Sequence, residues 1–425
     1  MKTGFARREF LMAIGAAGAA VSLKGCARAA KPRVVVVGGG FGGASCAKYI
    51  NRIDPGIDVV VVERNREYVT CPFSNNVIGG LRTLGSLTHG YEGLGARDGI
   101  TVVIDTATAV DAQARTVSLA GGNRLAYDRL VLSPGIAIRW GALDGYDEAA
   151  AEAMPHAWKA GPQTLLLKRQ LAAMEDGGTV VIAAPEYPYR CPPAPYERAS
   201  MVAHYLKTNG KARSKIVILD AKDTIPKQAL FEQGWGRFYE GMIEWVPRGQ
   251  GGTATRVDPA TKTVYAEAGE FKADVACIVP PQSAGGIAIS AGAADEDGWC
   301  PIDPWTLEST LRPGVHVLGD SCIAGAMPKS GFSANSQAKV CAAAIVALLN
   351  DSQPPEPVFM NTCYSTIAPD YGISIYGAYR ATEHAIVAVL GSVSLSPLDA
   401  PDEVRKAEFE YAQGWLASMT GEMFG

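Results

Sequence analysis

The stretch RVVVVGGGFGG, residues 33–43, decides the fold of this 425-residue chain. Its β-branched run predicts a buried parallel strand at 33–37, and a helical stretch follows at 44–52. A second apolar run at 58–62 predicts another strand, which ends at Glu63. Strand, glycine-rich turn, helix and strand in this order indicate a βαβ unit.

The glycines of this turn have the spacing of a dinucleotide-binding loop. Gly38 permits the tight turn, Gly40 lets the backbone approach a pyrophosphate, and Gly43 lets the helix pack against the strand. The helix N-terminus then faces the phosphate charge. Glu63 lies twenty residues after Gly43, where a carboxylate can accept ribose hydroxyls, and the adjacent Arg64 is expected at the cofactor too. We predict a dinucleotide site; the alternative is a glycine-rich turn that binds nothing.

A late apolar strand ends in Gly319-Asp320, and this pair indicates that the dinucleotide is FAD. In flavoproteins with two dinucleotide domains, an aspartate at such a strand end contacts the ribityl chain or the pyrophosphate. Lys329 and Ser330 are expected at the cofactor because they lead into a helix predicted at about 333–349. The positive end of that helix would stabilise the anionic reduced flavin.

The second half of the chain shows α/β alternation without a nucleotide fingerprint. Apolar strands are predicted at 179–184 and 215–220. Where a second glycine-rich loop would follow the first of them, the chain reads PEYPY at 185–189. Proline and large side chains block the approach of the backbone to a pyrophosphate. We therefore infer that NAD(P)H is not the electron partner.

Residues 1–30 are expected to be an export signal. Arg7 and Arg8 precede a short apolar run at 12–23 and a small-residue cleavage site at 27–30. This order is typical of a twin-arginine signal and predicts a periplasmic protein that is exported already folded. An amphipathic N-terminal helix is the alternative, and processing as a lipoprotein at the cysteine of this segment stays open.

Composition argues against several classes of function. The signal holds five basic residues and one acidic residue, so its removal lowers the formal net charge from −4 to −8. An acidic chain without a basic run argues against nucleic acid. No later segment offers about twenty unbroken apolar residues, so no integral membrane segment is expected. The nine Cys and five His form no CxxC pair and no CxxCH site, so we expect no metal and infer that redox chemistry uses an organic cofactor or thiols.

Three cysteines stand in distinctive contexts. Cys71 lies in YVTCPF soon after the ribose-binding acid, Cys191 lies in a stretch rich in proline and tyrosine, and Cys363 lies in NTCY. From the residues alone, Cys71 is equally a half-buried loop thiol, and the other two are a structural or a redox disulfide. With these contexts the chain resembles the flavoprotein subunit of flavocytochrome c sulfide dehydrogenase, a relative of sulfide:quinone reductases and disulfide reductases. The resemblance covers nearly the whole chain.

The resemblance implies roles for these residues. Cys71 would bind the 8α-methyl group of FAD through its sulfur, and Cys191 and Cys363 would form the redox disulfide. Glu197, close after Cys191, would be the acid/base carboxylate, with a solvated glutamate as the alternative. Hydrosulfide would be the substrate. Electrons would pass to a c-type cytochrome subunit, because this chain has no haem motif.

The whole pattern predicts an α/β fold: two Rossmann-like domains of the disulfide-reductase type and a small α+β C-terminal domain. The FAD domain is expected at 31–145 and 292–350 and the second domain at 146–291, and a linker-like stretch at 141–161 spans the boundary between them. Residues 351–425 would cover the flavin or meet the partner.

Two other functions remain open at this point. A sulfide:quinone reductase would share the flavin and the cysteines, and its terminal helix at 402–424 would lie on a membrane with Trp415 on the apolar side. The acidic residues of that helix disfavour anionic lipid. A non-catalytic flavin-binding assembly subunit would leave the three cysteines without a purpose. Trp415 is expected to cover the flavin or to belong to the core.

Overall fold

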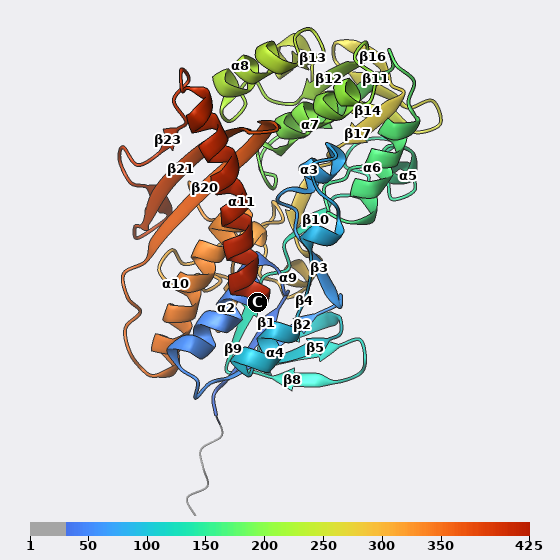
Figure 1. Ribbon diagram of the computed structural model, residues 1–425. Coiled ribbons are helices and arrows are strands. Elements are labelled where there is room, and N and C mark those ends of the chain that lie inside the picture. The colour runs from blue at the N-terminus through green and yellow to red at the C-terminus, as the bar shows by residue number, and fades with distance from the viewer. Residues whose placement is uncertain (1–30) are drawn as a thin grey trace, which may run out of the picture. The chain divides into compact units, whose positions relative to one another are not determined.

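A five-stranded parallel sheet forms around the strand predicted at 33–37. The computed structural model describes residues 31–425 (Figure 1), so the predicted export signal lies outside the described residues. The sheet has the order β19-β9-β1-β2-β5, with bounds Val315–Val317, Arg129–Leu132, Arg33–Val37, Asp58–Glu63 and Thr101–Ile104. Val34, Val35 and Val36 are fully buried, as a strand covered on both faces requires. Helices α2 (Phe41–Ile53) and α10 (Gly331–Leu349) pack against each other beside it.

A second parallel sheet carries the other α/β half. Its order is β13-β12-β11-β17, with bounds Ile243–Val246, Lys215–Asp220, Thr179–Ala184 and Val275–Ile278. Val180 and Ile182 belong to one core, and Val181 and Ala183 to another, so alternate side chains bury the two faces of β11. Its helices are α6 (Pro162–Ala173), α7 (Ala194–Thr208) and α8 (Gln228–Phe238). The strands predicted at 179–184 and 215–220 are confirmed.

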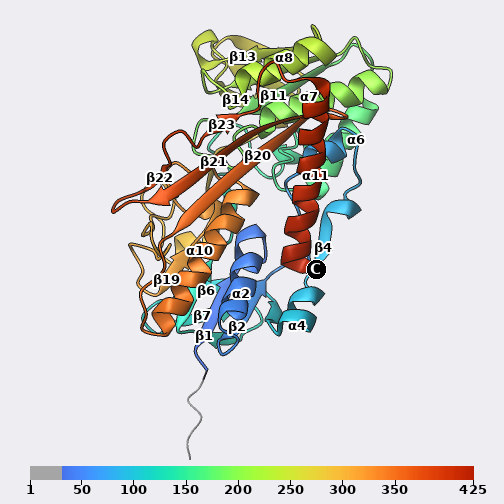
Figure 2. The same cartoon turned by 60° about the vertical axis from the view of Figure 1, so that its left-hand side comes forward.

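The C-terminal part is an antiparallel sheet with one long helix. The sheet contains β20 (Val358–Ala368), β21 (Tyr371–Ala381), β22 (Ile386–Ala388) and β23 (Ser394–Leu395). Helix α11 (Asp402–Phe424) runs along it in both views (Figures 1 and 2). Ala412 and Leu416 are buried, and Trp415 stacks on Phe41 and Phe332. The apolar side of this helix therefore faces the protein.

Smaller elements complete the unit. Three-stranded sheets are formed by β6, β7 and β8 (Ala107–Asp111, Thr116–Leu119, Arg124–Ala126) and by β14, β15 and β16 (Ala254–Asp258, Thr263–Ala266, Gly269–Lys272). Two-stranded sheets pair β3 with β4 (Glu67–Val69, Thr88–Gly90) and β10 with β18 (Ile136–Ile138, Gln282–Ala284). Short helices are α3 (Ser74–Ile78), α4 (Glu92–Asp98), α5 (Ala150–Ala153) and α9 (Gly286–Ser290).

The observed architecture is the predicted α/β fold with a C-terminal α+β region. Residues 32–425 form a single compact unit, so the boundaries of the three domains stay predictions. The linker predicted at 141–161 is wrong, because this stretch contains α5 and buries Met154 and Trp158. Its many small and polar residues are typical of a linker, so the sequence pattern did not predict an ordered segment. Helix α10 is long and apolar enough to cross a membrane, but it packs against α2 in the core.

Candidate functional site

The glycine-rich loop joins β1 to α2 and leaves no room for a side chain at two of its glycines. Gly38 has a φ of +105°, and a Cβ atom there would lie 2.3 Å from the carbonyl oxygen of Ser133. A Cβ atom at Gly43 would lie 1.8 Å from the carbonyl oxygen of Gly38. The backbone N–H of Gly39 donates to Glu63 Oε2 at 2.8 Å, so the carboxylate at the end of β2 also holds the loop. Only glycine satisfies the turn and the helix packing at once.

A cavity of about 900 Å³ opens over this loop. It is lined by eight of the residues that the sequence singled out: Gly38, Gly40, Glu63, Arg64, Cys71, Gly319, Asp320 and Ser330. Gly43 does not line the cavity; it lies in the first turn of α2, packed against the carbonyl oxygen of Gly38. Lys329 does not line the cavity: its ammonium donates to the carbonyl oxygens of Asp320 at 2.9 Å and Cys322 at 2.7 Å. It therefore holds the turn that carries Asp320.

Asp320 presents an unused acceptor to this cavity. Among residues 31–425, its buried Oδ1 atom has no hydrogen-bond partner. Its Oδ2 atom lies 3.9 Å from the guanidinium of Arg190, and burial raises the pKa of this carboxyl. A buried acceptor without a partner costs about 1–3 kcal/mol, which a ligand hydroxyl would recover. The glycine cradle, the two carboxylates and the volume all fit FAD.

A smaller cavity of about 100 Å³ adjoins the first. The two share Cys71, Pro72, Arg190, Ser330 and Gly331, so Cys71 lies where they meet. Five aromatic side chains also line it: Phe73, Trp158, Phe332, Tyr364 and Trp415. Within the described part of the chain, the buried indole N–H groups of the two tryptophans have no acceptor. Trp415 lines this smaller cavity and not the larger one, so its predicted position over the flavin stays a prediction.

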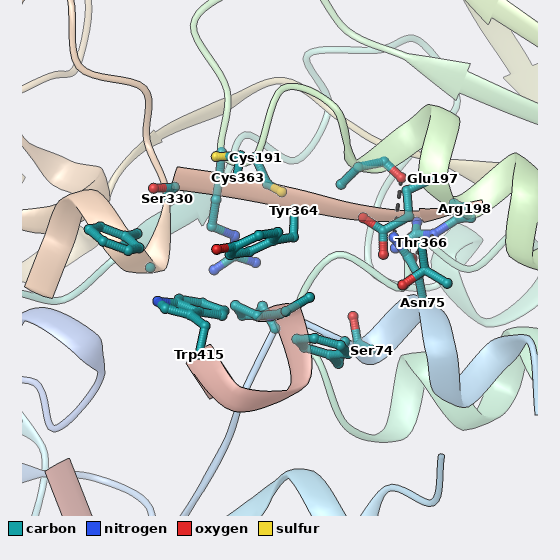
Figure 3. Close-up of a pocket in the computed structure, with 18 of the residues that line it drawn as sticks. Ser74, Asn75, Cys191, Glu197, Arg198, Ser330, Cys363, Tyr364, Thr366 and Trp415 are labelled. Atoms are coloured by element: carbon teal, nitrogen blue, oxygen red, sulfur yellow. Dashed lines mark hydrogen bonds between the residues drawn. The ribbon is translucent and has the colours of Figure 1, made fainter. Parts of the chain in front are cut away.

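Cys191 and Cys363 lie together in this smaller cavity (Figure 3). Cys191 precedes α7 with a φ of +55°, and Cys363 lies in β20. Both are free thiols in the structure, so the disulfide between them stays a prediction. Burial raises the pKa of Cys191, and the neighbouring Cys363 and Glu197 raise it further. The other described cysteines line neither cavity; they are buried at positions 46, 277, 300, 322 and 341.

Glu197 is the carboxyl of this cavity. It lies in the first turn of α7 and is 9% exposed, so the alternative of a solvated glutamate is wrong. Burial raises its pKa to about 7, against the opposing charge of Lys227 and hydrogen bonds with Ser365 and Asn75. A carboxyl that titrates near neutral pH can both accept and donate a proton.

Three cations of the site were missed by the sequence analysis. Arg190 lies between the two cavities, and its adjacency to Cys191 was a signal that could have revealed it. Arg198 is 2% exposed and donates to the carbonyl oxygens of His156 at 2.8 Å and Ala157. Lys227 donates to residues of β20 and has no local sequence signal, because only the tertiary fold brings it there.

Comparison with protein families matches three segments of the chain. Residues 164–280 match the family described as sulfide dehydrogenase [flavocytochrome c] flavoprotein chain, central. Residues 355–424 match flavocytochrome c sulphide dehydrogenase, flavin-binding. Residues 32–160 match pyridine nucleotide-disulphide oxidoreductase.

Individual relatives point the same way. A sulfide dehydrogenase [flavocytochrome c] flavoprotein chain from Chlorobaculum thiosulfatiphilum is 67% identical over 45 residues, which are 11% of this chain and 94% of the relative. A mitochondrial sulfide:quinone oxidoreductase from Dictyostelium discoideum is 24% identical over 307 residues. That match covers 68% of this chain and 65% of the relative, so the chain spans less than two thirds of that protein.

Solved structures share the fold. The sulfide:quinone oxidoreductase from Aquifex aeolicus aligns with a TM-score of 0.73 at 16% identity and covers 92% of both chains. A NAD-dependent persulfide reductase from A. fulgidus aligns with a TM-score of 0.63 at 17% identity, covering 81% of this chain and 64% of that one. At these identities the likeness shows the fold alone.

Proposed function

Since the chain belongs to the family of flavocytochrome c sulfide dehydrogenase flavoprotein chains, we propose that it oxidises hydrosulfide at the Cys191–Cys363 pair. The chain is a flavoprotein oxidoreductase with FAD as its cofactor. One observation carries the proposal: two thiols and a carboxyl of raised pKa share a cavity that opens onto the dinucleotide cavity. The two thiols are the groups that thiol–disulfide exchange uses, and the carboxyl can take up or supply the proton.

The residues of the larger cavity would hold FAD. The backbone at Gly38 and Gly40 suits a pyrophosphate, and Glu63 suits ribose hydroxyls. The free Oδ1 atom of Asp320 suits a hydroxyl of the ribityl chain. We propose that the sulfur of Cys71 binds the flavin covalently, which is supported by its position where the two cavities meet.

The cysteine pair would react in its oxidised form. Hydrosulfide attacks the sulfur of one cysteine, an S–S bond forms, and the old S–S bond breaks to release the other cysteine as a thiolate. A second hydrosulfide then attacks the outer sulfur of the persulfide. The S–S bond to the cysteine that was attacked first breaks, which leaves that cysteine as a thiolate and releases hydrogen disulfide. Glu197 accepts one proton from this product, which departs as an anion. FAD supplies the acceptor for the two electrons released when the cysteines form their disulfide again.

The electrons would leave to a c-type cytochrome subunit. The name of the family supports this partner, and residues 1–425 contain no CxxCH motif of their own. We also propose a periplasmic location, supported by Arg7 and Arg8 ahead of the apolar run. Copurification of the chain with a c-type haem protein from the periplasmic fraction tests both proposals.

Anaerobic reduction of the flavin by sulfide tests the reaction. Wild-type protein should lose its oxidised flavin absorbance on adding sulfide, and Cys191→Ser should keep it because no disulfide can form. Cys341→Ala is the matched control, since this buried thiol in α10 lines neither cavity. The proposal is wrong if Cys191→Ser binds FAD and is still reduced by sulfide at the wild-type rate.

A further inference from the structure

The end of α11 packs against the β3–β4 strand pair. The ring of Phe424, the last residue of that helix, is 8% exposed and pairs with three other rings. It stacks on His89 with 5.2 Å between the ring centroids. Its centroid lies 5.6 Å from that of Tyr68 and 5.7 Å from that of Tyr91. All three separations lie in the range of favourable aromatic pairs, so these rings enclose the end of the C-terminal helix.

Two of these rings lie on the dinucleotide loop. A Cβ atom at Gly40 would lie 3.2 Å from the ring and the hydroxyl of Tyr68. A Cβ atom at Gly39 would lie 2.6 Å from the ring of Tyr91. Tyr68 also lines the larger cavity, whose residues fit FAD. Phe424 itself lines neither cavity, so its route to the cofactor passes through Tyr68.

Further contacts fix the same end of α11. The ammonium of Lys48 in α2 donates to the carbonyl oxygen of Gly425 at 3.2 Å and lies 3.1 Å from the carboxylate of Asp98 in α4. Lys48 is 3% exposed, so this ion pair is shielded from water. At Gly93 of α4, a Cβ atom would lie 2.0 Å from the carbonyl oxygen of Phe424. The last turn of α11 is therefore held by α2 and α4, and its ring has little room to move.

We propose that Phe424 is a positioning residue of the FAD site, which holds Tyr68 against the dinucleotide loop and so slows the release of the cofactor. The glycines of this loop have no side chains with which to fix their own conformation. A ring packed on the loop supplies that rigidity, and Phe424 fixes the ring. A site that is ordered in advance loses less freedom when its ligand binds. This role concerns the cofactor and does not depend on the oxidation of hydrosulfide.

Release of FAD from the loaded, full-length protein measures this role. Cys71→Ser serves as the parent, so that a covalent bond cannot mask the release. After dilution, the rise in the fluorescence of free flavin gives the dissociation rate. Phe424→Ala in this parent should release FAD at least about tenfold faster, which corresponds to about 1.4 kcal/mol. Phe424→Leu keeps much of the apolar volume, and its rate should lie between those of the parent and Phe424→Ala.

Two comparisons separate this role from a general loss of stability. Leu416→Ala truncates another buried residue of α11 that lines neither cavity. It should lower the Tm without the faster release seen with Phe424→Ala. In a parent that also carries Tyr68→Ala, the change Phe424→Ala should speed release by less than about threefold, because the ring through which it acts is gone.

Gly93→Ala tests the same contact from α4 without changing a ring. Its Cβ atom would displace the end of α11, so FAD release should again be faster than in the parent. A folded Phe424→Ala or Gly93→Ala with the parental rate would overturn the inference, and so would a Leu416→Ala that releases FAD as fast as Phe424→Ala. The assay contains no sulfide, so a failure of sulfide to reduce the flavin would refute the proposed function and leave this result standing.

Discussion

Glu197→Gln tests the buried carboxyl through its effect on stability. Burial raises the pKa of Glu197 from its ordinary 4.5 to about 7. A group whose pKa rises on folding stabilises the folded state below its unfolded pKa, and this contribution is lost as the pH rises through the folded pKa. The difference of about 2.5 pKa units, at 1.36 kcal/mol for each, amounts to about 3 kcal/mol. Glutamine carries no charge at any pH and escapes this loss.

The free energy of unfolding of wild-type protein should therefore fall by about 3 kcal/mol relative to that of the variant between about pH 4.5 and pH 8. With an unfolding entropy of about 2.1 cal/mol/K per residue, this corresponds to a relative change in Tm of about 3 °C. Thermal unfolding followed by circular dichroism at pH 4 and pH 8 measures it for both proteins. Glu383→Gln is the control, because the side chain of Glu383 is 86% exposed and should show no such change.

The reasoning is refuted by a Tm difference between Glu197→Gln and wild type that is the same at pH 4 and pH 8. That result would mean that the carboxyl has an ordinary pKa in the folded protein. The activity of Glu197→Gln tests the same carboxyl in a second way. The variant should reduce its flavin with sulfide more slowly and without the dependence on pH near 7 that wild type should show, because the amide cannot accept a proton.

Two further predictions concern the cofactor. Gly43→Ala should give protein that does not retain FAD, because the new Cβ would lie 1.8 Å from the carbonyl oxygen of Gly38. Gly236→Ala is the control and should retain FAD, because a Cβ at this position of α8 meets open space. Equal flavin absorbance in the two variants would contradict this account. Acid precipitation of wild-type protein should leave flavin on the peptide that contains Cys71, whereas Cys71→Ser should release it; free flavin from wild type would rule out the covalent bond.

The βαβ unit could be predicted because its signals are local. The strand at 33–37 lies at Arg33–Val37 as expected, and the strand predicted at 58–62 extends one residue further to Glu63. The helix predicted at 44–52 begins earlier, at Phe41, because glycines 42 and 43 belong to its tightly packed first turn. Helix α10 begins at Gly331 because the side chain of Ser330 accepts a hydrogen bond from the N–H of Ser333.

Other parts of the site could not be predicted, because they depend on contacts between residues that are far apart in the sequence. The stretch at 141–161 read as a linker, yet Trp158 packs there beneath the buried guanidinium of Arg198. Lys329 follows the Gly319-Asp320 pair closely in sequence, but its ammonium binds the carbonyl oxygens behind that turn. Local composition predicts neither outcome, because each depends on which polar and aromatic groups remain to hydrogen-bond or pack with one another after the sheets have formed.

The sequence by itself determined the dinucleotide loop, the absence of a second fingerprint and the three cysteine contexts, since each depends on residues that are neighbours in the chain. Only the tertiary structure decided that Cys71, Cys191 and Cys363 share a cavity and that Glu197 is buried beside them. It also brought Lys227 to β20, across 136 residues of sequence from Cys363. Burial and charge set the reactivity of such groups, and both arise only when distant segments pack together and exclude water.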